Sequence, residues 1–224
     1  MIERSSIFDM IGPIMIGPSS SHTAGVVRIG RVARFLLGDV PEKVEVVFYN
    51  SFATTYEGHG SDRAVIGGLL GFANDDEQIK NAIEIAKNKN IDIQFKSVLQ
   101  ASIYHPNTIR IKVSKNKKTV EILGVSRGGG LITIKEVDGF NANFTGQLHT
   151  LVILALDIKG SIAFIADVIA HDDCNIATMT VSRNNKNEDA KLIIEMDSPI
   201  SENSLIYLKN LRWVKEVIYI PEIG

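Results

Sequence analysis

Apolar and polar positions alternate along the chain at two spacings, one typical of helices and one typical of strands. Apolar residues at every third or fourth position predict helices over 24–37, 63–72, 77–88, 161–171 and 202–211. Runs rich in β-branched and aromatic residues predict strands over 44–49, 108–113, 119–123, 131–137, 150–156, 176–182, 191–196 and 214–220. The mixture of both patterns indicates an α+β fold.

A short polar break at Gly146 and Gln147 divides this pattern into two parts. Residues 1–146 mix helices and strands, which predicts a mixed α/β domain. Residues 147–224 follow the order βαββαβ, which is the ferredoxin-like split motif. The length of 224 residues also fits two domains.

Composition narrows the class of ligand. The formal net charge is −2, and basic and acidic residues are interspersed, which argues against nucleic acid or an anionic membrane as the main partner. The sequence shows neither a secretory signal nor an apolar run that could span a bilayer, so we expect a cytoplasmic protein with a small ligand. The single cysteine, Cys174, excludes an intrachain disulfide and argues against a zinc or iron-sulfur site built from this chain's own thiolates.

The segment from Gly17 to Thr23 places several hydroxyls and one imidazole directly before a predicted helix. Side-chain donors and the free N–H groups of a helix N-terminus together favour an anion site. A serine that only caps the helix is the simpler alternative. The candidate ligand-binding residues of this serine turn are Ser19, Ser20, Ser21, His22 and Thr23.

Two further segments carry polar groups in loops. In the sequence Gly58-His59-Gly60-Ser61-Asp62, the imidazole of His59 is a candidate base because histidine is the usual general base at neutral pH. We expect the hydroxyl of Ser61 to bond one ring nitrogen of His59 and to fix its tautomer. Ser126 precedes Gly128-Gly129-Gly130, which either lets the backbone approach a ligand closely or makes a tight bend.

These segments, with Ser6-Ile7-Phe8-Asp9-Met10 ahead of them, resemble the motifs of the iron-sulfur-dependent L-serine dehydratases in order and separation, over nearly all of residues 5–135. The resemblance implies the β subunit of an enzyme that eliminates water from L-serine and yields pyruvate and ammonia without pyridoxal phosphate. In that family a 4Fe-4S cluster acts as a Lewis acid on the departing hydroxyl while a base removes the Cα proton. With one cysteine in this chain, the cluster is expected on a separate α subunit, without which the chain is inactive.

The resemblance also assigns roles to residues. It implies that His59, assisted by Ser61, is the base, and that the serine turn binds the substrate. Ser51, Thr55 and Ser126 belong to the same substrate-binding motifs. His22 is expected to orient or hydrogen-bond the substrate carboxylate, and the reverse assignment of the two histidines is left open. The family usually has threonine where Ser61 stands.

Residues 149–224 resemble an ACT domain, a ferredoxin-like module that commonly binds amino acids at dimer interfaces. Asp157, Gly160 and Ser161 lie at the turn where the resemblance implies an effector, although Lys159 replaces the frequent proline. A module that only mediates self-association is the alternative.

A second function class is a regulatory module without catalysis. The first domain is similar to allosteric-substrate-binding domains, which serve as anion-binding units in some phosphoglycerate dehydrogenases. The imidazole and hydroxyl of His59 and Ser61 favour the enzyme, because a sensor of amino acids has no need of a base.

Overall fold

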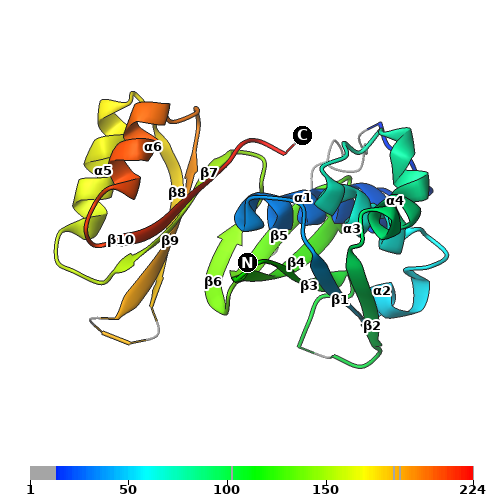
Figure 1. Ribbon diagram of the computed structural model, residues 1–224. Helices are drawn as coiled ribbons and strands as arrows, with labels where there is room; N and C mark the ends of the chain where they lie inside the picture. The colour runs from blue at the N-terminus through cyan, green and yellow to red at the C-terminus, as the bar shows by residue number, and fades with distance from the viewer. Residues whose placement is uncertain (1–13, 102, 184, 187, 224) are drawn as a thin grey trace. The chain divides into compact units, whose positions relative to one another are not determined.

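The computed structural model describes residues 14–101, 103–183, 185–186 and 188–223 (Figure 1). These residues form two compact units, which divide between Asp138 and Gly139. The boundary expected between Gly146 and Gln147 follows the strand β6 (Phe140–Phe144), whereas the two units divide before this strand. β6 belongs to the second unit because it packs against strands of that unit. The predicted motif at 6–10 lies outside the described residues.

The first unit is built on one sheet whose strands follow the order β2-β1-β3-β4-β5. The strands are β1 (Lys43–Tyr49), β2 (Asp92–Val98), β3 (Thr108–Lys115), β4 (Lys118–Gly128) and β5 (Leu131–Val137). β1 pairs in parallel with β2, and every other pair in this order is antiparallel. The predicted strands, including the hairpin of β3 and β4, are confirmed. β2 was not predicted, because it lies at the sheet edge and its residues are at most half-buried.

Helices cover this sheet and carry the candidate site. They are the π-helical turn η2 (Ser20–Ala24), α1 (Gly25–Leu37), α2 (Ser51–Thr55), α3 (Ser61–Leu70), the 3₁₀ turn η3 (Glu77–Asn81) and α4 (Ala82–Asn88). The helix predicted over 77–88 therefore begins as a 3₁₀ turn. α1 ends at Leu37 and is capped by Gly38, whose left-handed φ of 91° suits a glycine. No helix in the described ranges is long and apolar enough to cross a membrane.

The helices α1 and α3 cross with their backbones in close contact. A Cβ atom on Gly68 would lie 2.1 Å from the carbonyl oxygen of Val27, and one on Gly30 would lie 2.6 Å from that of Val65. Only glycine allows this approach. The crossing matters for the site, because α1 follows the serine turn directly and α3 begins at Ser61.

The second unit is a four-stranded antiparallel sheet with the order β10-β7-β9-β8. Its elements are β7 (His149–Leu156), α5 (Ser161–His171), β8 (Ile176–Arg183), β9 (Asp189–Met196), α6 (Glu202–Lys209) and β10 (Val214–Ile220). The order βαββαβ is the one that the sequence predicted. Both helices cover the same face of the sheet (Figure 1), where Leu151, Ile165 and Ile194 form a fully buried core.

Candidate active site

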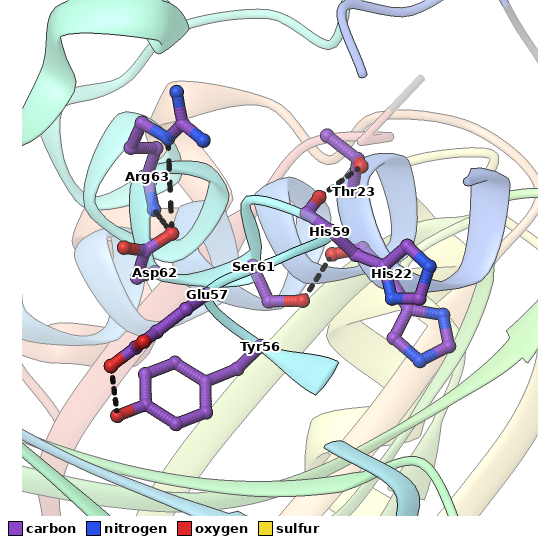
Figure 2. A network of polar contacts seen from close by, with 8 residues as sticks. All are labelled: His22, Thr23, Tyr56, Glu57, His59, Ser61, Asp62 and Arg63. Atoms are coloured by element: carbon purple, nitrogen blue, oxygen red, sulfur yellow. Dashed lines mark hydrogen bonds and ion pairs between the residues drawn. The ribbon is translucent and has the colours of Figure 1, made fainter. Parts of the chain in front are cut away.

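The serine turn and the loop before α3 are joined by two hydrogen bonds (Figure 2). The hydroxyl of Ser61 donates to the carbonyl oxygen of His22 at 2.7 Å, and the hydroxyl of Thr23 donates to the carbonyl oxygen of His59 at 3.3 Å. Ser61 and Thr23 are both buried. Two segments that are far apart in the sequence therefore share one site, as the sequence reasoning expected.

The two histidines of these segments lie against each other. The ring centroids of His22 and His59 are 4.7 Å apart and the rings are tilted by 46°. His22 Nε2 and His59 Nδ1 are buried, and neither has a hydrogen-bond partner among the described residues. Buried polar atoms without a partner are rare in proteins, and they often mark a place where a ligand binds.

Two hydroxyls of the serine turn hold the ring of His22. Its Nδ1 lies 3.1 Å from Ser19 Oγ and 3.0 Å from Ser21 Oγ. Ser19 also caps the turn, because its Oγ accepts the backbone N–H of His22 at 3.3 Å. The serine turn that was predicted to precede the helix is therefore itself helical from Ser20 onward and continues directly into α1.

The surroundings of His22 favour its neutral form. Burial lowers the pKa of His22 below its ordinary value of 6.5, and the neighbouring His59 lowers this pKa further when it carries a positive charge. A neutral imidazole has one nitrogen that donates a hydrogen bond and one that accepts. His22 can therefore receive or donate one bond to a ligand without carrying charge.

The predicted bond between Ser61 and the ring of His59 is wrong. Ser61 is the first residue of α3, and the left-handed Gly60 (φ 70°) turns the chain just before it. The turn directs the hydroxyl of Ser61 to the backbone of His22 instead of to the ring two residues earlier. Ser61 thus fastens the two segments together and does not fix the tautomer of His59.

Phe52 is a member of the site that the sequence reasoning missed. It stands on α2, is fully buried, and meets the ring of His22 edge-on with centroids 4.9 Å apart. Its neighbours Ser51 and Thr55 were predicted to bind substrate. In the structure the Thr55 hydroxyl donates to the Ser51 carbonyl at 2.7 Å, and the Thr55 carbonyl accepts the backbone N–H of His59 at 2.9 Å. Contact of their hydroxyls with a substrate stays a prediction.

The glycine-rich segment after Ser126 also reaches the serine turn. The N–H of Gly129 donates to Ser20 Oγ at 3.2 Å, and Arg28 of α1 donates to the Gly130 carbonyl at 2.6 Å. Ser126 is fully buried, and its Oγ has no partner among the described residues. A Cβ atom at Gly25 would lie 2.1 Å from this oxygen, so the hydroxyl lies directly against the start of α1. All three predicted segments meet at one place.

A small cavity adjoins this site. Its volume is about 170 Å³, below the roughly 300–1,000 Å³ of pockets for drug-sized molecules, so it suits only a small ligand. The residues that line it include Gly17, Thr23, Gly58, His59, Arg63 and Lys80. Sequence reasoning missed Arg63 and Lys80, because isolated basic residues on helices usually face solvent.

Comparison with known proteins identifies the family. Residues 6–137 match the family model of the serine dehydratase beta chain. The chain belongs to this family. It is 47% identical over 217 residues to the probable L-serine dehydratase beta chain of Bacillus subtilis (strain 168), which covers 97% of this chain and 98% of the relative. It is 35% identical over 199 residues to the L-serine dehydratase beta chain of Peptoniphilus asaccharolyticus, covering 88% and 90%.

The beta chain is also similar to part of another enzyme. A D-3-phosphoglycerate dehydrogenase of Methanocaldococcus jannaschii is 27% identical over 140 residues, which cover 62% of this chain but 26% of that enzyme. The similarity therefore concerns one portion of a longer protein.

The described residues of the beta chain do not fit an iron-sulfur cluster. They contain no group of three or more His, Cys, Asp or Glu side chains that could hold a metal ion. The single thiol, Cys174, lies in the core of the second unit and donates to the carbonyl of Pro199 at 3.3 Å. A cluster at this site would need its thiolate ligands from another chain.

The turn predicted to bind an effector lies at the start of α5. Gly160 has a left-handed φ of 84°, and a Cβ atom added there would meet no atom within 4 Å. The hydroxyl of Ser161 donates to the Ile158 carbonyl at 2.9 Å, and Asp157 forms an ion pair with Arg183. These contacts explain the local conformation, and binding of an effector stays a prediction.

Proposed function

We propose that this beta chain, together with an α subunit that carries a 4Fe-4S cluster, forms an L-serine dehydratase that converts L-serine to pyruvate and ammonia. Family membership supports the reaction, since the relatives with full coverage are named L-serine dehydratase beta chains. The observation that carries the proposal is the pair of adjacent imidazoles, His22 and His59, each with a buried ring nitrogen that has no partner among the described residues.

In this proposal the chain removes a proton and positions the substrate. Loss of the Cα proton and of the β-hydroxyl of L-serine gives aminoacrylate, which tautomerises and hydrolyses to pyruvate and ammonia. His59 accepts the Cα proton, because its imidazole lies beside His22 and keeps a buried ring nitrogen without a partner among the described residues. His22, held by the serine turn, binds the substrate. Ser51, Thr55 and Ser126 complete the surroundings.

The α subunit is proposed because of the donor set of this chain. A 4Fe-4S cluster needs several thiolates, and the only cysteine of the sequence is buried in the second unit. The cluster and its chemistry therefore belong to the partner, and the active site is completed only in the assembly.

The second unit is proposed to be an ACT domain that binds an amino-acid effector or mediates self-association. Its element order βαββαβ and its sheet order support this assignment. The open space above Gly160 supports an effector at the turn from Asp157 to Ser161. The domain is not required for the chemistry at the histidines.

A regulatory module without catalysis is the second candidate. The match to part of a D-3-phosphoglycerate dehydrogenase favours it, because 140 residues of this chain match an enzyme of a different name. The paired histidines argue against it, since a sensor of amino acids has no need of a second imidazole placed as a base beside the serine turn.

Anaerobic co-expression with the cysteine-rich α subunit of the same organism tests the proposal. We expect a brown complex that forms pyruvate from L-serine, measured with a coupled lactate dehydrogenase assay, and a colourless, inactive beta chain when it is purified alone. Pyruvate formation by the beta chain alone would contradict the proposal. So would an inactive complex whose absorbance shows an intact cluster.

A further inference from the structure

The hydroxyls of Ser19 and Ser21 lie within hydrogen-bond distance of each other and of the ring of His22. The Oγ atoms of Ser19 and Ser21 are 3.3 Å apart, and both lie within hydrogen-bond distance of His22 Nδ1, at 3.1 and 3.0 Å. Ser19 Oγ already accepts the backbone N–H of His22 at 3.3 Å. The third hydroxyl, of Ser20, faces Gly129 instead.

The number of protons in this set decides how the bonds run. Each hydroxyl donates one proton, and the backbone N–H of His22 donates a third. If Nδ1 carries no proton, Ser19 can donate to Ser21 and Ser21 to Nδ1, so both hydroxyl protons and the backbone N–H have acceptors within the turn, and only the ring Nε2–H is left for a ligand. If Nδ1 carries a proton and donates to Ser21, then Ser21 donates to Ser19. Two groups are then left without a partner among the described residues, the proton of Ser19 and the lone pair of the buried Nε2.

We infer that Ser19 and Ser21 are positioning residues that hold His22 in the tautomer with its proton on Nε2. His22 then presents a buried N–H donor that has no acceptor in the described part of the chain. A buried donor without a partner is unfavourable, so the site favours a ligand with an oxygen acceptor. The chemical class of this ligand is a carboxylate.

This inference rests on the proposed function and deepens it. A carboxylate is what an α-amino acid offers, and a hydrogen bond from a neutral N–H to an ionised oxygen is stronger than one between neutral groups. With its proton on Nε2 and its Nδ1 engaged, His22 has no free lone pair for the Cα proton. The base role therefore falls to His59, and the serines act through His22 rather than on the substrate.

The tautomer can be measured on the full chain without any dehydratase activity. In a beta chain labelled with ¹⁵N-histidine, nitrogen-detected or long-range ¹H–¹⁵N NMR at pH 8 distinguishes protonated from bare ring nitrogens. The His22→Gln variant assigns the signals. We expect a protonated Nε2 and a bare Nδ1 for His22. A protonated Nδ1 in the wild-type chain would overturn the inference.

Substitutions in the turn separate positioning from simple structural support. In Ser19→Ala/Ser21→Ala we expect the His22 signals to move toward a mixture of both tautomers. The separate variant Ser21→Thr keeps the hydroxyl, so its His22 signals should match those of the wild-type chain. Ser20→Ala is the matched control in the same turn, and it should leave the His22 tautomer unchanged. An unchanged tautomer in the double variant would also refute the inference. If the double variant does not fold, the tautomer measured in the wild-type chain still decides the inference.

Kinetics of the assembled complex then test the ligand. For Ser19→Ala/Ser21→Ala we expect KM for L-serine to rise roughly tenfold, because the hydrogen bond from His22 to the substrate carboxylate is weakened. The change in kcat should be smaller. A fall in kcat with unchanged KM would contradict carboxylate binding by His22. A wild-type complex without activity would instead contradict the proposed function, while the NMR result would stand on its own.

Discussion

Two sets of buried polar groups, one in each unit of the chain, differ in whether they find hydrogen-bond partners. In the second unit Glu195 is buried and accepts three hydrogen bonds, from the N–H and the hydroxyl of Thr145 at 2.9 and 2.8 Å and from the hydroxyl of Thr178 at 2.8 Å. In the first unit His22, His59 and Ser126 each keep a buried polar atom without a partner in the described residues.

This difference separates a structural role from a functional one. Satisfied buried groups fix a fold, because every donor and acceptor finds its partner within it. Unsatisfied groups reduce stability unless a ligand completes them. Three such groups, of His22, His59 and Ser126, lie where the serine turn, the loop before α3 and the glycine-rich segment meet, which favours this place in the first unit as the candidate site.

Replacement of His59 by alanine should have the largest effect on the first unit. Loss of a general base typically lowers the rate by 10²–10⁴, so we expect kcat of the complex to fall by at least about a hundredfold. The cluster absorbance and the assembly with the α subunit should not change. His171→Ala is the matched control, because His171 lies in the second unit with 77% of its side chain exposed. Wild-type turnover in His59→Ala would move the base role to another residue, first to His22.

Replacement of Glu195 by alanine should destabilise the second unit without affecting the candidate site. It leaves three donors without their acceptor, and we expect the free energy of unfolding to fall by about 2–4 kcal/mol. Urea unfolding followed by the fluorescence of Trp213, which packs on the core of this unit, measures the loss. Glu195→Gln, which keeps one acceptor oxygen, should lose less. The kcat of folded complex should stay within twofold, and a large fall would mean that the units are not functionally separate.

Periodicity was sufficient for most of the fold. The helix α1, the hairpin of β3 and β4 and the whole order of the second unit follow from the spacing of apolar residues, since each buries one face or stripe. The edge strand β2 was missed, because its pairing with β1 depends on the backbone while few of its side chains are buried. The strand β6 was missed as well, and it shifted the division of the chain to Asp138.

The members of the site could be predicted, but their contacts could not. The sequence motifs contain His22, His59, Ser61 and Ser126, and these residues lie close together in the structure. The partner of the Ser61 hydroxyl depends on the left-handed turn at Gly60 and on the crossing of α1 with α3, neither of which local sequence specifies. Phe52 gave no signal, because a phenylalanine in an apolar position is ordinarily part of the core.

The smallest effect we predict is a dependence of stability on pH that comes from His22. Its pKa is lowered in the folded chain by burial and then by His59, whereas in the unfolded chain it titrates near 6.5. Below about pH 6.5 the unfolded chain takes up a proton that the folded chain does not. The contribution to stability is therefore complete above pH 6.5 and is lost as the pH falls toward and through the folded value.

The slope of this loss cannot exceed about 1.4 kcal/mol per pH unit, and solvent around the half-buried ring makes it smaller. Urea unfolding followed by circular dichroism between pH 8 and 5.5 should show a steeper loss in the wild-type chain than in His22→Gln, whose side chain does not titrate. His171→Gln should follow the wild-type curve. Identical curves for the wild-type chain and His22→Gln would show that folding does not favour the neutral form of His22. The contrast between the two units would then rest on hydrogen bonding alone.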